Sequence, residues 1–368
     1  MTKCVFIGEA WGEEEAKYES PFVGTAGQEL ARILSKSGFP IESPQNKYCS
    51  PLTMMSKWKK FPYPLLNVFN QRPSYNSNNI QLLYAKPRDG IPIDKTLPER
   101  AFNNTIHYVR ADKAHHVHKL HSDLQLLSPN LIITLGATAC WALGLGEQIG
   151  KLRGFVHETS YGKVFPTYHP AAILYKWKLR APTLLDLAKA RREMASPKIN
   201  NSYREIWTEP TITDLWQWWH IYGSKSDLLA IDIETIRRSQ ISEVGFASDP
   251  NHALHIPFCW EEKDNNHKKI YRGWWPSIDE EVQAWKFVKH VCESPIPKIG
   301  QNLKYDVYWL AKEMGIAICN WQHDTMVAAH CWQPELGKSL YDLGSYFLDN
   351  ELSWKSIRKE SQKDKDND

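Results

Sequence analysis

The chain has 368 residues, and its 45 lysines and arginines nearly balance its 42 aspartates and glutamates, which leaves a formal net charge of +3. This balance excludes a protein that attracts nucleic acid through one global basic field, so any contact with DNA must use local patches. The length suits two domains of ordinary size. The lack of a signal peptide, an apolar membrane span or paired-cysteine spacing predicts a protein of a reducing cytoplasm that has no membrane partner.

The first half of the chain alternates apolar, strand-like runs with helical patterns. The strand-like runs fall within residues 4–7, 66–73, 129–139 and 164–174. Strands that alternate with helices predict a parallel-sheet α/β/α sandwich, in which functional side chains lie at the carboxyl ends of the strands. The polar stretch 196–204 contains a proline and predicts a linker, so we expect a first domain over residues 1–195.

Five side chains near these strand ends are candidates for a site. Glu9 follows the first strand, and Glu15 closes an acidic run that opens a helix. Phe22 precedes a glycine-rich turn, Asn67 lies in the second run and His169 ends the last. Four of them have a structural alternative: Phe22 as a core residue, Asn67 as a partner of backbone groups, His169 as a hydrogen-bonding histidine, and Glu15 as part of a solvated helix start. Their joint order along the chain favours a ligand pocket.

Together these segments resemble the family 4 type of the uracil-DNA glycosylase superfamily, over about residues 3–193. The resemblance implies that Phe22 stacks on a flipped uracil and that Asn67 reads its edge, donating to O4 and accepting from N3–H. It also implies that His169 reaches the base O2, where negative charge grows as the glycosidic bond breaks. Glu9 and Glu15 would orient water or stabilise the oxocarbenium-like sugar, and no metal is needed for this step.

The same resemblance implies a wedge that fills the space left by the flipped base. A loop over Ala171, Ala172, Ile173 and Leu174 is expected to take this role. Members of this family type usually hold an iron–sulfur cluster with four cysteines, but the seven cysteines of this chain show no C-x-x-C spacing. Gln71 stands at the place of the third ligand and a position near His116 at that of the fourth, so no cluster is predicted.

Two further departures fall beside the expected water site. Trp11 replaces the usual proline of the first motif, and Ala16 replaces an acidic residue. They leave open the alternative that the domain binds a base without hydrolysing its glycosidic bond. The histidine-rich stretch 115–121 has spacings that suit a metal, but no matching carboxylate or cysteine accompanies it. A solvated, weakly basic helix face is the favoured interpretation of that stretch.

Local basic patches are the candidates for DNA contact. Lysines or arginines gather, mostly beside tryptophan, at residues 57–60, 176–180 and 237–238. Such patches combine phosphate contact with stacking of bases on aromatic rings. A solvated surface loop is the alternative for each.

The most informative stretch of the second half is the apolar run 229–235. Strand side chains alternate, so Asp232 and Glu234 project from one face while the isoleucines between them occupy the other. Two like charges on one side of a strand are costly unless a cation compensates them, although two solvated carboxylates on an edge strand remain the alternative. A second cluster, 298–306, runs from a short strand into a helix and places Asp306 in the first turns of that helix.

These two motifs, in this order, resemble the proofreading 3′–5′ exonuclease domain of family A DNA polymerases over about residues 227–352. The resemblance implies a ribonuclease H-like domain with a mixed sheet, which we expect over 205–352. It implies that Asp232, Glu234 and Asp306 bind Mg²⁺ or Mn²⁺, the cations that suit oxygen ligands. The last family motif, Tyr-x-x-x-Asp, is missing, and the polar tail 353–368 is expected to be disordered.

The pairing of the two domains resembles the N-terminal part of certain phage family A DNA polymerases. It implies a DNA-processing fragment that combines uracil recognition or excision with 3′–5′ proofreading. The implied partners are DNA with single-stranded, frayed or uracil-containing segments and a polymerase module in cis or in trans. The alternative is a non-catalytic DNA-binding or replisome-docking module in which one or both domains have lost activity.

Overall fold

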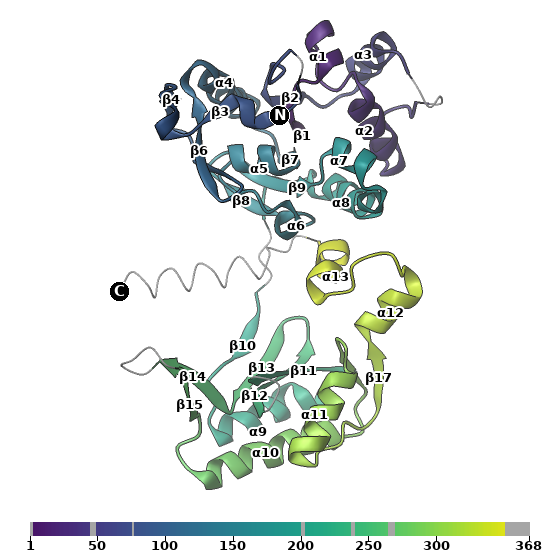
Figure 1. The fold of residues 1–368 in the computed structure, drawn as a ribbon. Helices are drawn as coiled ribbons and strands as arrows, with labels where there is room; N and C mark the ends of the chain where they lie inside the picture. Colours follow the sequence, from purple (N-terminus) through teal and green to yellow (C-terminus); the bar gives the residue numbers. More distant parts are fainter. Residues whose placement is uncertain are drawn as a thin grey trace. The chain divides into compact units, whose positions relative to one another are not determined.

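The structure is a computed structural model that describes residues 3–44, 49–75, 77–199, 203–236, 240–263 and 269–349 (Figure 1). The chain forms two compact units, one of Met1–Asn201 with Gly344–Asp368 and the other of Ser202–Leu343. The basic pair at 237–238 and the predicted tail at 353–368 lie outside the described residues. Within the described ranges, no helix is both long and apolar enough to cross a membrane.

The first unit is built on a five-stranded sheet with the order β2-β1-β7-β9-β8. Its strands are β1 (Cys4–Ala10), β2 (Leu65–Phe69), β7 (Leu131–Leu135), β8 (His157–Thr159) and β9 (Gly162–Thr167). All neighbours pair in parallel except β8 with β9. The carboxyl ends of β1, β2, β7 and β9 therefore meet at one edge of the sheet, as the sequence predicted.

Helices cover both faces of this sheet, and the alternation of side chains in β1 shows why. Phe6 belongs to an apolar cluster with residues of α2 and α8, whereas Val5 and Ile7 belong to another with residues of α4. The predicted parallel-sheet α/β/α sandwich is confirmed. The helices are α1 (Glu13–Tyr18), α2 (Thr25–Lys36), α3 (Pro51–Lys60), α4 (Ala111–Leu127), α5 (Ala137–Ala142), α6 (Ile149–Leu152), α7 (Pro170–Tyr175) and α8 (Arg180–Glu193).

Short elements fill the connection between β2 and α4. They are the 3₁₀ turns η1 (Ile80–Leu83) and η2 (Pro87–Asp89) and the strands β3 (Tyr84–Ala85), β4 (Ile93–Asp94), β5 (Arg100–Phe102) and β6 (Thr105–Arg110). The strands β3, β4 and β5 all pair with β6. A further 3₁₀ turn, η3 (Trp177–Leu179), joins α7 to α8.

The second unit has a six-stranded mixed sheet with the order β10-β13-β12-β11-β16-β17. Pairing is antiparallel on both sides of β12 and parallel elsewhere, which confirms the predicted mixed sheet. The strands are β10 (Glu205–Trp207), β11 (Leu229–Ile236), β12 (Gln240–Asp249), β13 (His252–Pro257), β16 (Lys298–Gly300) and β17 (Trp321–Asp324), with a separate hairpin of β14 (Cys259–Lys263) and β15 (Lys269–Gly273).

One face of this sheet packs against helices, and the alternation in β11 decides which side chains are buried. Ile231 and Ile233 join a core formed with residues of α9, α10 and α11, while Asp232 and Glu234 stay exposed on the other face. The helices are α9 (Ile212–Ile221), α10 (Ile278–Glu293), α11 (Lys304–Met314), α12 (Thr325–Trp332) and α13 (Leu340–Phe347), with the 3₁₀ turn η4 (Gly223–Lys225) after α9.

The two ends of the second unit differ in how they relate to the predicted boundaries. Its first residue, Ser202, falls inside the predicted linker at 196–204. Its last residue, Leu343, lies before the predicted end at 352, because Gly344 and the residues after it group with the first unit.

Candidate active sites

The candidate base-binding residues of the first unit converge over one glycine at the carboxyl end of β1. A methyl group built on Gly8 would lie 2.3 Å from Asn67 Oδ1 and 2.5 Å from Phe22 Cζ. Real side-chain atoms never approach so closely, so any residue other than glycine at this position would displace the ring and the amide. Asn67 lies on β2, directly beside Gly8 in the parallel pairing. The sheet therefore places the phenyl ring and the amide together.

Phe22 is held in place by its backbone. Its φ of 58° lies in the left-handed region, which is unfavourable for a bulky residue and requires support from its surroundings. The support comes from Trp58, whose Nε1–H donates to the Phe22 carbonyl oxygen at 2.7 Å. The side chain is only 4% exposed and also contributes to the apolar core. The core role and the proximity to Asn67 therefore coexist.

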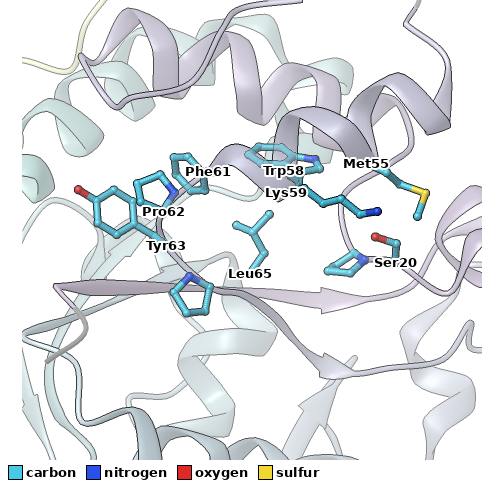
Figure 2. A pocket seen from close by; sticks show the side chains of 10 residues that line it. Ser20, Met55, Trp58, Lys59, Phe61, Pro62, Tyr63 and Leu65 are labelled. Carbon is cyan, nitrogen blue, oxygen red and sulfur yellow. The ribbon is translucent and has the colours of Figure 1, made fainter.

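A surface hollow adjoins Trp58. It has a volume of about 420 Å³ and is lined by Trp58, Ser20, Lys59 and Tyr63 among others. In Figure 2 the indole, the ammonium-bearing chain of Lys59 and the Ser20 hydroxyl border the same space. The hollow therefore offers a flat aromatic ring, a cation and a hydroxyl beside the segment that carries Phe22.

His169 is the N-cap residue of α7, and its ring has a defined tautomer. The Ala171 backbone N–H donates to His169 Nδ1 at 3.2 Å, so the proton of the neutral ring lies on Nε2. Its ring centroid lies 6.4 Å from that of Phe22. Desolvation lowers the pKa of His169, against the opposing influence of the nearby carboxylates of Glu9 and Glu15. The ring is therefore a neutral donor at neutral pH.

Glu9 is tied to a buried network that the sequence did not reveal. The Thr138 hydroxyl donates to Glu9 Oε2 and accepts from Arg100 Nη1, the latter at 2.9 Å. Arg100 is buried, and it also contacts the Tyr84 hydroxyl and the Glu147 carboxylate. The guanidinium therefore compensates negative charge near the site. Its position 91 residues away in the chain from Glu9 left no local pattern to detect it.

Glu15 is not part of a solvated helix start. It is buried, and its Oε1 accepts from the Gly24 backbone N–H at 2.9 Å. This bond joins α1 to the turn that follows Phe22. Nearby, the indole Nε1–H of Trp11 is buried and has no hydrogen-bond partner among the described residues, while its backbone N–H donates to the Gln71 carbonyl at 3.2 Å.

The segment 171–174 forms helix α7 and not the expected loop, and its role as a wedge stays a prediction. Ala171 and Ala172 are partly exposed in its first turn, but Ile173 is fully buried in the apolar core. Moving Ile173 out of that core would lower the free energy of unfolding by about 2–5 kcal/mol. The exposed apolar residues of this helix are Leu174 and Tyr175 at its C-terminal end.

The histidines of α4 are engaged in separate polar contacts. His116 Nε2 lies 3.1 Å from Gln71 Oε1, and His118 Nε2 lies 2.9 Å from an Asp94 carboxylate oxygen. His121 contacts the Ala142 carbonyl and stacks on Tyr161. The pKa of His116 falls to about 4, mainly because of desolvation. His115 and His118 are exposed, as the interpretation of a solvated helix face predicts, whereas His116 and His121 are half-buried.

The contact between Gln71 and His116 also bears on the iron–sulfur cluster that the family type implies. A cluster of that type needs thiolate ligands. The Gln71 amide, which contacts His116, does not fit the third of the four ligand positions.

In the second unit, Asp306 reaches across to the strand that carries the other two acids. Its Oδ1 accepts from the Ile233 backbone N–H at 2.9 Å, between Asp232 and Glu234 in the chain. Asp306 is only 2% exposed. Asp306 is therefore brought to the strand that carries Asp232 and Glu234. The helix–strand contact is strengthened beside them, where the hydroxyls of Tyr305 and Thr235 lie 2.6 Å apart.

Mutual repulsion and burial change the protonation of these acids. Desolvation and then Asp232 raise the pKa of Asp306 to about 7. Desolvation and then Glu234 raise the pKa of Asp232 to about 6. Although Asp232 keeps an exposed surface, the protein around it removes part of its hydration. Such elevated values are typical of acids that lack a compensating cation.

The three side chains are of the right chemical type for a metal ion, but they are not arranged as a preformed site. The three donors are carboxylates, the ligands that Mg²⁺ and Mn²⁺ prefer. Across the described ranges, however, no three or more His, Cys, Asp or Glu side chains are arranged as a site that could hold a metal ion. A cation would therefore need to draw these side chains together.

Two further features of this site were missed from the sequence. Asp324 accepts from the backbone N–H groups of Asn302 and Leu303 and also raises the pKa of Asp306. An apolar hollow of about 400 Å³ adjoins Asp232 and is lined largely by Ala, Gly, Ile and Leu residues of the sheet. The acids therefore border an apolar surface with room for a planar group.

Comparison with known proteins identifies two parts of the chain, and the second match extends beyond Leu343, the last residue of the second unit. The family model described as "Uracil DNA glycosylase superfamily" matches residues 1–191. The chain belongs to this superfamily. A second model, described as "3'-5' exonuclease", matches residues 274–367, a range that contains Asp306 but not the strand with Asp232 and Glu234. The chain thus joins a glycosylase-superfamily domain to a 3′–5′ exonuclease domain.

The relatives of the glycosylase domain include enzymes of one type. The chain is 29% identical to the type-4 uracil-DNA glycosylase of Thermotoga maritima over 195 residues, which are 52% of this chain and 77% of the relative. It is 28% identical to the type-4 uracil-DNA glycosylase of Saccharolobus solfataricus over 206 residues, which are 54% of this chain and 74% of the relative.

Solved structures with some likeness to the chain are exonucleases. Escherichia coli RNase D, an exoribonuclease involved in structured RNA processing, has a TM-score of 0.29 and 16% identity over 42% of this chain and 36% of its own. The EXD2 exonuclease domain soaked in Mg and dGMP has a TM-score of 0.25 and 15% identity over 39% of this chain and 69% of its own. Both TM-scores are below 0.5, so the assignment of the second unit depends on its family match and sheet topology.

Proposed function

We propose that the glycosylase domain accommodates a flipped uracil and cleaves its glycosidic bond. The observation that supports this proposal is the convergence of Phe22 and Asn67 over Gly8, with the His169 ring nearby. An aromatic ring next to an amide is the pair of groups that a planar, hydrogen-bonding base needs. Glycosylases must take the base out of the stack before they read it.

The chemistry of the amide favours uracil over cytosine. The Asn67 NH₂ group donates to uracil O4 and its carbonyl oxygen accepts from N3–H, whereas cytosine presents the opposite pattern. Asn67 is only 4% exposed, so a wrong base would leave buried polar groups unpaired. The preference for uracil over cytosine then comes from the cost of these unpaired groups as much as from the hydrogen bonds between Asn67 and uracil.

The tautomer of His169 suits the developing charge. Since Nδ1 accepts from Ala171, the Nε2–H is the donor that would face uracil O2 as the bond to the sugar breaks. Glu9 and Glu15, the two acids that influence its pKa, would orient the attacking water or stabilise positive charge on the sugar. The Arg100–Thr138 pair fixes the Glu9 carboxylate for that role. A wedge is assigned to the exposed end of α7 at Leu174, beside Ala171 and Ala172.

Recognition without excision is the second candidate, and Trp11 favours it. Trp11 stands where the first motif of the family has a proline, and its bulky indole has a buried N–H with no partner among the described side chains and backbone. In this case Phe22 and Asn67 still bind the base, but water does not reach the sugar and the glycosidic bond is not cleaved.

Uracil release from a single-stranded oligonucleotide tests both candidates. Wild-type protein is compared with Asn67→Ala, His169→Ala and, as a matched control on a different helix, His118→Ala. Excision predicts release that is lost in the first two variants and kept in the control. If wild type binds uracil DNA in preference to thymine DNA and releases nothing, recognition alone holds. Equal binding of both DNAs would refute the assignment of Phe22 and Asn67.

We propose that the second domain removes 3′-terminal nucleotides with Mg²⁺ or Mn²⁺ held by Asp232, Glu234 and Asp306. The contact of Asp306 with the Ile233 backbone supports this proposal. The cations would activate water and stabilise the leaving 3′ oxygen. Asp232→Ala should abolish trimming of a 5′-labelled single strand, whereas Asp279→Ala, an exposed acid of α10, should not. Full trimming by Asp232→Ala would refute the ligand assignment.

We also propose that the chain is a DNA-processing part of a phage-type family A DNA polymerase that acts in the host cytoplasm on single-stranded or frayed 3′ ends. The joining of the two domains supports this context. The alternative is a replisome-docking module without catalysis. Genomic sequence downstream of the Asp368 codon tests the context: a helix with Tyr-x-x-x-Asp followed by polymerase motifs supports it, and an unrelated gene refutes polymerase in cis.

A further inference from the structure

The residues that follow the exonuclease unit are an integral part of the glycosylase unit. Ser345 is fully buried and Tyr346 is 6% exposed, whereas Phe347 and Leu348 are exposed. Arg153 Nη1 donates to Ser345 Oγ at 3.0 Å, and its guanidinium lies 5.0 Å from the Tyr346 ring centroid. Ser345 and Tyr346 are therefore the buried anchors of the segment 344–349.

Arg153 and Gly154 form the surface that contacts this segment, which we call its seat. A methyl group built on Gly154 would lie 2.8 Å from Ser345 Cβ and 2.9 Å from the Ser345 carbonyl oxygen. The φ of Gly154 is +76°, so glycine is also required by the backbone. A side chain at this position would push the segment away. The contact is therefore as close as in a domain core.

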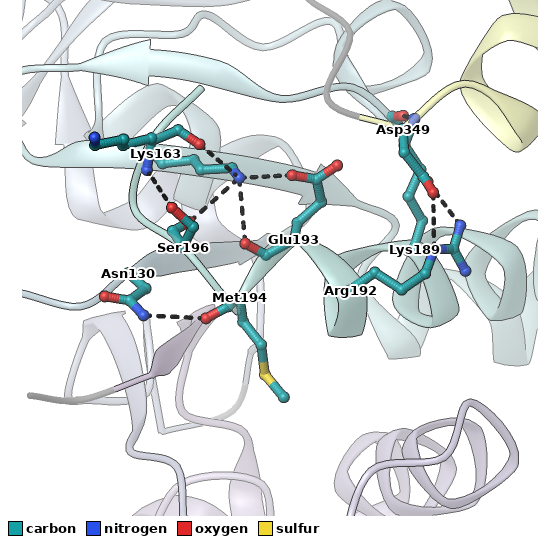
Figure 3. A network of polar contacts seen from close by, with 10 residues as sticks. Asn130, Lys163, Lys189, Arg192, Glu193, Met194, Ser196 and Asp349 are labelled. Atoms are coloured by element: carbon teal, nitrogen blue, oxygen red, sulfur yellow. Dashed lines mark hydrogen bonds and ion pairs between the residues drawn. The ribbon is translucent and has the colours of Figure 1, made fainter. Parts of the chain in front are cut away.

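Charge complementarity continues at the end of the segment. Arg192 of α8 donates two hydrogen bonds to the Asp349 carboxylate, at 2.9 and 2.7 Å (Figure 3). The Asp349 charge also acts to raise the pKa of Lys189. Lys189 Nζ donates to the Gly154 carbonyl at 2.7 Å. Helix α8 thus holds both the segment and its seat.

The seat is linked to the segment that carries His169. The Arg153 guanidinium donates to Asp186, and Asp186 Oδ2 accepts from the Thr167 hydroxyl at 2.7 Å. The Thr167 carbonyl accepts from the Gly136 N–H at 2.8 Å, and the Gly154 N–H donates to the Pro166 carbonyl at 3.1 Å. All of these groups lie within four residues of His169 or contact residues that do.

We propose that residues 344–349 act as a built-in peptide ligand of the glycosylase unit. Docking of Ser345 and Tyr346 completes the Arg153–Asp186–Thr167 network, and this network holds the strand end from which His169 projects. The glycosylase unit is then incomplete without chain that lies beyond the exonuclease unit. The consequence for uracil binding rests on the proposed function, but the docking itself does not.

Hydrogen exchange of the full chain tests the docking. The amides to follow are those of Gly154, Gly136 and Ala171, whose acceptors lie in the network or on His169. Ser345→Leu, which has no room beside Gly154, should increase their exchange rates at least about 10-fold, as expected when a local unit opens more easily. Tyr346→Ala should raise the same exchange rates without shortening the segment.

The matched control is Leu348→Ala in the same segment, because Leu348 is 51% exposed. Its exchange rates should equal those of wild type. Unchanged exchange in both Ser345→Leu and Tyr346→Ala would overturn the proposal, as would equal acceleration in Leu348→Ala.

A second readout separates this proposal from the proposed function. The two anchor variants should bind a uracil-containing single strand at least about 10-fold more weakly than wild type. Faster exchange combined with no preference of wild type for uracil would support the docking and refute the base-recognition function. Faster exchange with unchanged uracil binding would refute the link from the segment to His169.

Discussion

Replacing Asp306 with asparagine should stabilise the exonuclease unit in the absence of metal, although it removes a candidate ligand. Asp306 is buried, and its pKa is about 7 against an ordinary value of 3.8. Between these values the folded unit binds a proton that the unfolded chain releases. Stability is therefore greatest below pH 3.8 and declines as the pH rises through 7. Asparagine removes this loss and keeps the oxygen that accepts from Ile233.

The size of the effect follows from the two pKa values. A difference of about three is equivalent to about 4 kcal/mol at 1.36 kcal/mol for each pKa unit. Because Asp306 and Asp232 titrate as a pair, this figure is an upper limit of the right order. For a unit of this size, each kcal/mol raises Tm by about 3–5 °C. We therefore expect Asp306→Asn to raise the Tm of the exonuclease unit by several degrees at pH 8.

Calorimetry in the presence of a chelator measures this effect at pH 8 and at pH 4. The gain should be present at pH 8 and nearly absent at pH 4, where both side chains are neutral. Addition of Mg²⁺ at pH 8 should raise the Tm of wild type and leave that of Asp306→Asn unchanged. Asp214→Asn is a control with the opposite sign, because the bonds from Thr211 lower the pKa of Asp214. A lower Tm for Asp306→Asn at pH 8, or a gain independent of pH, would refute the reasoning.

Three further predictions concern the glycosylase domain. Gly8→Ala should abolish the preference for uracil DNA over thymine DNA in a binding assay while circular dichroism stays that of wild type; retained preference would contradict the crowding at this position. Because the pKa of His169 is lowered, uracil release should show no decline as the pH falls through 6.5, and a midpoint at 6.5 or above in a pH–rate profile would exclude a neutral donor. Ile173→Ala should lower the free energy of unfolding by about 2–5 kcal/mol, whereas Leu174→Ala should weaken only binding to duplex DNA; the reverse pattern in denaturation and binding measurements would restore the wedge to Ile173.

The parts of the fold that follow from local pattern were predictable. The alternation in β11 separates Ile231 and Ile233 from Asp232 and Glu234 because a strand has a period of two, and no distant residue alters that. Asp306 was assigned to the first turns of a helix, but its burial depends on where α11 packs on the sheet. The elevated pKa could not be read from the sequence for the same reason.

The parts that depend on long-range packing were missed. Arg100 lies in an irregular excursion, and only the folded chain brings it to Thr138 and Glu9. Residues 171–174 were expected to form a loop, but the proline before them starts a helix, since its fixed φ suits the first helical position. The docking of Ser345 is the extreme case, because its partner Arg153 is 192 residues away.

The two candidate sites place opposite demands on proton and metal, and this difference separates them experimentally. The proposed base excision uses a neutral His169 and no metal ion, and burial favours the neutral state above pH 6.5. The proposed trimming uses ionised carboxylates at Asp232 and Asp306, whose pKa values are about 6 and about 7. Cation binding must displace those protons, so metal-dependent trimming should rise steeply between pH 6 and 8 while base recognition stays constant. If these acids hold a cation as proposed, its binding and their ionisation are one coupled event, and the side chains need not form a complete site before the metal binds.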